Sequence, residues 1–149
     1  MRSLLFVPAD SERKIEKALG SAADVVIRDL EDSVAPANKP AARELAVQTL
    51  ARPRKPEQQV YVRVNALDSG LTAQDIEAVM PSGPDGLIHP KTETGACVET
   101  VAGMAGKDTP IIAIATETAK AMFGLGTYGA LNANLKGLAW GAEDLSNAL

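Results

Sequence analysis

Short apolar runs recur along this chain, and each is followed by a longer segment with a helical pattern of apolar and polar residues. The runs predict six strands, at 4–7, 24–30, 60–64, 86–88, 111–115 and 137–140. Helices are predicted between them, at about 11–19, 39–51, 72–80, 94–104 and from Glu117 into the 120s. Strands that alternate with helices in this way favour βαβ units and a parallel sheet.

The spacing of the strands and their apolar pattern limit the number of possible architectures. From the second run onward the strands begin at 24, 60, 86, 111 and 137, intervals of 36, 26, 25 and 26 residues. Apolar residues are continuous within each run, which is typical of strands covered on both faces or filling a barrel. Two α/β architectures therefore fit: an open doubly wound sheet, and about the first six units of a TIM (β/α)8 barrel.

Composition and charge exclude several classes of protein as interpretations of this sequence. The 149 residues, 46% hydrophobic and 23% charged, suit one folded domain over 1–149 and exclude a disordered chain. A net charge of −4 with scattered lysines and arginines predicts no nucleic-acid or membrane partner. One cysteine and one histidine exclude a zinc cluster of those residues. Without a long apolar span or a signal-peptide core, the expected location is the cytoplasm.

Charged side chains lie at or just after the C-terminal ends of the predicted strands, where parallel α/β folds gather reactive groups. They are Asp29, Glu31 and Asp32 at the second strand, Arg63 in the third, Lys91 after the fourth, Glu117 after the fifth and Asp144 after the sixth. Oxygen-rich sites of this kind suit Mg²⁺ better than zinc or copper. The sequence therefore predicts an acidic, magnesium-type site with two cations beside it.

Each candidate also has a purely structural interpretation. Asp144 could cap a helix, Glu117 could sit in a first helical turn, and the acidic segment 29–32 could be a solvated strand end. For Arg63 a functional role is favoured over a structural one, because a guanidinium inside a barrel needs a partner. His89 is interpreted as a polar residue at the barrel mouth. Triad hydrolysis is disfavoured, since no serine lies in a GxSxG turn.

An ordered set of motifs resembles a known family. The motifs are RSLLFVPA (2–9), DVVIRDLEDSVAPANKPAAR (24–43), VRVN (62–65), PDGLIHPKTE (84–93), IIAIATETAKAMFGL (111–125) and LAWGAEDLS (138–146). Together they resemble the citrate lyase beta-subunit-like CoA ester lyases of the aldolase/citrate lyase superfamily, which include malyl-CoA lyases. The resemblance runs from Arg2 to the end of the chain.

The resemblance implies a TIM barrel, a Mg²⁺ cofactor and carbon–carbon cleavage or formation in 3-hydroxyacyl-CoA thioesters, with acyl-CoA and a small keto acid as partners. Glu117 and Asp144 match the family's metal ligands. Arg63 matches the arginine that holds a substrate oxygen. Asp29, Glu31, Asp32 and Lys91 match in register without an assigned role. The family pattern before the lysine is leucine-proline, whereas this chain has His89 and Pro90.

The family continues for more than a hundred residues beyond the motifs found here, through two further strands and a segment that supplies a catalytic aspartate. The resemblance therefore implies a C-terminally truncated chain, inactive by itself, whose full-length form is a homotrimer or hexamer. Two other functions stay open: a non-catalytic partial-barrel binding or subunit module, and a class II pyruvate-type aldolase of the same superfamily.

Overall fold

The computed structural model describes residues 1–130 and 134–148, and within them six strands form one parallel sheet. The strands are β1 (Leu4–Pro8), β2 (Val25–Asp29), β3 (Gln59–Arg63), β4 (Gly86–His89), β5 (Ile111–Ile114) and β6 (Leu135–Ala139). All six predicted strands are therefore confirmed, with ends that shift by a few residues.

Helices separate the strands, as the pattern predicts. They are α1 (Glu12–Leu19), α2 (Lys39–Leu50), α3 (Thr72–Val79), α4 (Gly95–Ala105), α5 (Ala119–Gly124) and α6 (Ala142–Ala148). Short 3-10 turns supplement them at η1 (Pro36–Asn38), η2 (Leu67–Ser69), η3 (Met80–Ser82) and η4 (Leu125–Ala130). No helix of the described residues is long and apolar enough to cross a membrane.

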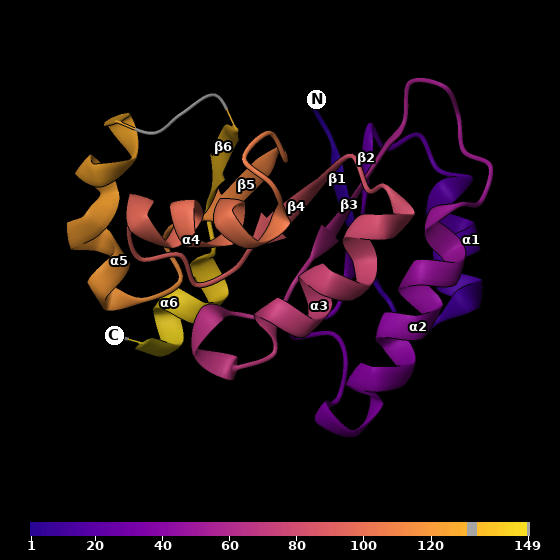
Figure 1. Cartoon of the computed structure of the whole chain (residues 1–149), viewed down its shortest axis with the longest axis horizontal. Coiled ribbons are helices and arrows are strands. Elements are labelled where there is room, and N and C mark those ends of the chain that lie inside the picture. The colour runs from indigo at the N-terminus through magenta and orange to yellow at the C-terminus, as the bar shows by residue number, and fades with distance from the viewer. Residues whose placement is uncertain (131–133, 149) are drawn as a thin grey trace.

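Strand order decides between the two predicted architectures. The order is β1-β2-β3-β4-β5-β6, and every neighbouring pair is parallel. A doubly wound sheet reverses its order at a switch point, whereas a barrel adds each strand beside the one before. The chain therefore has the fold of a partial TIM barrel, and Figure 1 shows its helices ranged along the sheet.

The two faces of the sheet carry different apolar clusters. The outer face packs against α2, α3 and α4, and its cluster includes Val62, Leu87 and Ala113 from the strands. The inner cluster consists of Val25, Ile27, Tyr61, Ile88, Ile112 and Ile114. Because strand neighbours in register share a face, this assignment also fixes where the charged strand residues point.

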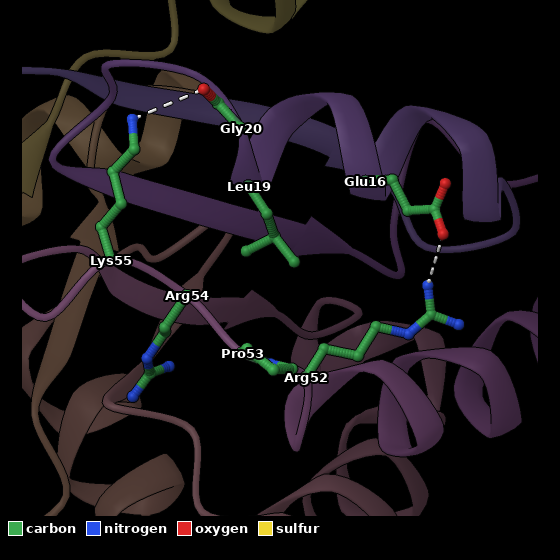
Figure 2. Close-up of a pocket in the computed structure, with 7 residues that line it drawn as sticks. All are labelled: Glu16, Leu19, Gly20, Arg52, Pro53, Arg54 and Lys55. Carbon is green, nitrogen blue, oxygen red and sulfur yellow. Dashed lines mark hydrogen bonds and ion pairs between the residues drawn. The ribbon is translucent and has the colours of Figure 1, made fainter.

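A groove of about 480 Å³ lies at the N-terminal ends of the strands, between the end of α1 and the segment before β3. Figure 2 shows the residues that line it, among which Arg52 and Lys55 already bind other groups of the protein. Arg52 pairs with Glu16 at 3.2 Å, and Lys55 donates to the carbonyl oxygens at the end of α1. This groove is at the opposite end of the sheet from the charged residues that the sequence singles out.

Candidate active site

The register between β2 and β3 creates the centre of the site. Asp29 and Arg63 are Cα partners at the C-terminal ends of these two strands. Both lie on the inner face, because Asp29 is two residues beyond Ile27 and Arg63 is two beyond Tyr61. Arg63 is also in register with Ile88 of β4, so the guanidinium is central to the strand ends.

Arg63 and Asp29 form a bidentate pair. Arg63 donates from Nε to Asp29 Oδ1 and from Nη2 to Asp29 Oδ2, both at 2.7 Å. The same carboxylate accepts the backbone N–H groups of Glu31 and Ser33, which folds the acidic segment back over the end of β2. The Arg63 guanidinium lies 4.9 Å from the centre of the Phe6 ring, a cation–π contact. The guanidinium is thus held in one orientation.

Glu31 connects Arg63 to a second cation. Its Oε2 lies 3.1 Å from Arg63 Nη1, and its Oε1 accepts a 2.6 Å hydrogen bond from Lys91 Nζ. Lys91 Nζ also lies 3.5 Å from Asp32 Oδ1 and 4.0 Å from Asp144 Oδ2. Three acidic side chains therefore surround Lys91, and the acidic segment after β2 is not simply a solvated strand end.

Glu117 and Asp144 approach the same cluster from β5 and β6. Glu117 is buried and accepts the backbone N–H of Lys91, while Asp144 lies in the first turn of α6. Gly141 permits this approach, because a Cβ there would stand 2.2 Å from Glu117 Cγ. The Gly141 N–H donates to Thr116 Oγ1 at 2.9 Å, which ties the two strand ends together.

Burial and charge shift the pKa values of these groups in different directions. Burial raises the pKa of Glu117 to about 7, with the negative charges of Glu31 and Asp144 adding to it. Burial also raises the pKa of Glu31. Burial opposes the charge on Asp29, but the Arg63 guanidinium outweighs it and lowers the pKa of that carboxyl. Opposed by burial, the Glu31 carboxylate still raises the pKa of Lys91.

The donor set fits a magnesium ion held by few protein ligands. Among residues 1–130 and 134–148, no group of three or more acidic, His or Cys side chains is placed to hold a metal. Glu117 and Asp144 would supply two carboxylate oxygens, and Mg²⁺ commonly completes its shell with water or substrate oxygens. The buried Oε2 of Glu31 accepts no hydrogen bond from the residues that the structure describes, although it lies near Arg63, so acceptor capacity remains at this point.

A cavity of about 450 Å³ opens beside the cluster, between the segments that follow β2 and β3. Glu31, Asp32 and Lys91 line it together with Asn65 and residues of η2. All the charged side chains predicted from the strand ends thus meet at one end of the sheet, and the sequence located them by their position after each strand.

Sequence reasoning missed the support beneath the site. Asp75 of α3 is buried and accepts from both the backbone and the side-chain nitrogen of Asn65, at 2.8 and 2.6 Å. Asn65 in turn accepts a 2.6 Å hydrogen bond from Lys39 Nζ. Asp75 falls in an ordinary helical pattern, so only the fold could bring it to Asn65.

His89 does not lie at the barrel mouth, contrary to the sequence interpretation. It is 1% exposed and in register with Ala113, a member of the outer cluster. Its neighbour Ile88 belongs to the inner cluster. The ring therefore points toward the helices, because successive residues of a strand face opposite sides of the sheet.

Comparison with known proteins shows the family of the chain. Residues 2–149 match the family described as HpcH/HpaI aldolase/citrate lyase. The chain belongs to this family. It is 37% identical over 148 residues to a (3S)-malyl-CoA thioesterase of Cereibacter sphaeroides, covering 99% of this chain and 51% of that protein. It is 41% identical over 141 residues to a citrate lyase subunit beta-like protein of Mycobacterium tuberculosis, covering 95% and 47%.

Similar solved structures support the same fold. A citrate lyase beta subunit from M. tuberculosis, complexed with oxaloacetate and magnesium, is 39% identical with a TM-score of 0.81, over 97% of this chain and 60% of that one. Protein CitE from the same organism, with magnesium, acetoacetate and coenzyme A, gives 39% and 0.82, over 97% and 50%. The chain spans about half the length of the curated relatives it matches.

Proposed function

We propose that the protein containing this chain is a Mg²⁺-dependent CoA ester lyase that cleaves or forms a carbon–carbon bond in a 3-hydroxyacyl-CoA thioester. The observation that carries the proposal is the convergence of Glu117 and Asp144 with the Arg63–Glu31–Lys91 network at one end of the sheet. Relatives described with magnesium, keto acids and coenzyme A support the substrate class.

In the proposed reaction the 3-hydroxyl loses its proton, the adjacent carbon–carbon bond breaks, and its electrons form the enolate of the acyl-CoA. The keto acid leaves, and the enolate carbon takes up a proton. Glu117 and Asp144 would hold the magnesium ion, which when bound supplies a Lewis acid for the keto-acid oxygens.

Arg63 supplies fixed positive charge for the oxygen on which negative charge develops. Its Nε and Nη2 hydrogen bonds are taken by Asp29, so the orientation of the guanidinium is set before substrate arrives. Nη1, which faces Glu31 and Asp32 at 3.1 and 3.7 Å, is the edge that remains for a substrate oxygen. Preorganised donors of this kind typically contribute a factor of about 10²–10³ in turnover.

A relative named (3S)-malyl-CoA thioesterase makes thioester hydrolysis the second candidate, because it breaks a different bond of a similar substrate. The two reactions are separated by their products from malyl-CoA: a lyase releases a keto acid and acetyl-CoA, whereas a thioesterase releases malate and free coenzyme A thiol. A pyruvate-type aldolase would act on pyruvate and an aldehyde without CoA.

The deciding experiment assays the purified protein with malyl-CoA and Mg²⁺, following keto acid and free thiol in parallel. Keto-acid release that chelator abolishes supports the lyase. Glu117→Gln should reduce that release by at least about 10²-fold, because it removes a proposed magnesium ligand. Thiol release without keto acid would establish the hydrolase instead. Aldol turnover of pyruvate, with no turnover of malyl-CoA, would contradict both CoA reactions.

A further inference from the structure

The turn between β4 and α4 holds Lys91 in an unusual backbone conformation. Its φ of 49° makes it the only non-glycine residue with positive φ among residues 1–130 and 134–148. Such a conformation is unfavourable for a residue with a Cβ and persists only where its surroundings impose it. Something in the fold must therefore hold this turn.

A buried hydrogen-bonded bridge spans the turn. The Thr92 hydroxyl donates to the His89 carbonyl at 2.8 Å, and the Thr92 Oγ1 to His89 Nδ1 distance is 2.6 Å. The hydroxyl has only one proton, so with that proton on the carbonyl oxygen the Nδ1–H group donates to Oγ1. His89 and Thr92 are 1% and 0% exposed, which shields both bonds from water.

The fold anchors the far side of this bridge as well. The Thr92 N–H donates to the Ile114 carbonyl of β5 at 3.1 Å, and the Tyr128 hydroxyl donates to the Thr92 carbonyl at 3.0 Å. Thr92 is thus fixed through both its backbone groups, and His89 is fixed by β4. Between these two points the chain has only Pro90 and Lys91 to place, and proline has a fixed φ of its own.

What the turn presents is part of the candidate active site. The backbone N–H of Lys91 donates to the Glu117 carboxylate, and its Nζ bonds to Glu31 at 2.6 Å. A displaced Lys91 would therefore release one oxygen of a proposed magnesium ligand and remove a cation from three carboxylates. The bridge is the connection between the outer core and these contacts.

Core packing alone does not account for a histidine here. The only side-chain hydrogen bond of His89 in the described structure is the one to Thr92, and its Nε2 is buried without a partner. Burying an unpartnered polar nitrogen costs free energy that an aliphatic side chain would not incur. The histidine's distinctive contribution is therefore its bond across the turn.

We propose that His89 and Thr92 are positioning residues that fix the backbone of Lys91, and through it the orientation of Glu117 toward the proposed magnesium ion. This inference rests on the proposed function for its last step only. The placement of Lys91 by the bridge is a property of the metal-free protein and is testable there.

The first arm of the experiment measures hydrogen exchange of the Lys91 amide in the metal-free, ¹⁵N-labelled protein. His89→Leu removes the bond between Nδ1 and Thr92 Oγ1 and should accelerate that exchange by about tenfold. Thr92→Val also removes the hydroxyl's bond to the carbonyl of residue 89, so it should accelerate exchange at least as much, and the double variant should add little to Thr92→Val. His89→Asn, whose amide can donate in place of Nδ1–H, should restore protection to within about threefold. Val98→Ala, in the same outer core but without a bond to the turn, is the matched control for lost packing.

The second arm titrates the same variants with Mn²⁺ as a probe for Mg²⁺, followed by water-proton relaxation. Affinity should fall by about five- to tenfold in His89→Leu and Thr92→Val and be retained in His89→Asn and Val98→Ala. Unchanged Lys91 exchange in His89→Leu, or exchange in His89→Asn as fast as in His89→Leu, would overturn the inference. A parent that binds no Mn²⁺, with the exchange pattern intact, would instead overturn the proposed function.

Discussion

Buried arginine side chains on the two faces of the sheet differ in how many partners they have. On the inner face, Arg63 makes two hydrogen bonds to Asp29 and an ion pair with Glu31. On the outer face Arg28, 0% exposed, makes a single 3.3 Å hydrogen bond to the Thr49 carbonyl. Its Nε and Nη1 have no partner within the described parts of the chain.

The difference appears in the pKa directions of the two arginines. Burial lowers the pKa of Arg28 to about 10, and the positive charges of Arg52 and Arg54 lower it further. Burial acts on Arg63 in the same sense, but its carboxylate partners raise the pKa overall. Burial alone therefore says little about function, whereas burial together with carboxylate partners distinguishes Arg63 from Arg28.

The largest expected effect tests the inner face. Arg63→Met should lower the free energy of unfolding by about 3–5 kcal/mol, because it leaves the buried Asp29 carboxylate without its partner. Urea unfolding measures this change. The double variant Arg63→Met/Asp29→Asn should recover part of the loss. A cost under about 1 kcal/mol would mean that the pair contributes no more than an exposed ion pair.

The next effect tests His89 on the outer face, whose pKa burial lowers from 6.5 to about 4. Below pH 6.5 His89 takes up a proton in the unfolded chain, whereas in the folded protein it does so only near pH 4. The free energy of unfolding therefore falls as the pH drops through this window. The loss attributable to His89 is at most about 3 kcal/mol.

Comparison of the parent with His89→Leu isolates this contribution. Glu117 acts in the opposite sense, since its pKa of about 7 lies above the value in an unfolded chain and its protonation favours the folded state. Urea unfolding at pH 7 and pH 5 should show the parent losing more stability than His89→Leu. Equal losses in the two proteins would place the acid sensitivity elsewhere.

A smaller change of opposite sign is expected at Arg28. Arg28→Met should be neutral or stabilise by about 1–2 kcal/mol, because it removes buried donors that have no acceptor. Arg28→Lys keeps a buried charge and serves as the control. Parallel urea titrations with Arg63→Met make the comparison direct. A destabilisation as large as that of Arg63→Met would show that both faces depend equally on their arginines.

The smallest effect is expected at Arg52, which lines the groove at the other end of the sheet. Glu12 is more than half exposed and pairs with Arg52, so Glu12→Gln should cost under about 1 kcal/mol. The cost should shrink further at high salt, because exposed pairs are screened. Thermal unfolding at two ionic strengths measures it. A large, salt-independent loss of stability would contradict this expectation, because it would mean that the pair of Glu12 with Arg52 contributes as much as a buried pair of the inner face.

The positions of the strands, and hence of the charged strand ends, could be predicted because each apolar run is bounded by polar segments. The partner of Arg63 could not be predicted, because Asp29 meets it through the β2–β3 register. The outward direction of His89 was also hidden. The strand around it is buried on both faces, so hydrophobic periodicity carries no information about which side a residue faces.

Two further features, the backbone of Lys91 and the enclosure of Arg28, lay beyond sequence reasoning for a different reason. The positive φ of Lys91 is imposed by the bonds of His89 and Thr92 across the turn, and lysine has no preference that would signal it. Arg28 reads in the sequence as one polar residue before an acidic cluster, and only the docking of α2 encloses it. Tertiary contacts set both features.

The strictly sequential strand order also shapes how the chain folds. Every strand pairs with the strand before it in the sequence, so each new pairing closes a loop of a single βα unit. The entropy cost of loop closure is therefore divided into similar, moderate steps and does not fall on one long-range contact. We expect the sheet to assemble by addition of neighbouring units, with the completely buried strands β2, β4 and β5 among the last segments to exchange their amides. In that sense the charged cluster is assembled progressively, as each strand end joins the one before it.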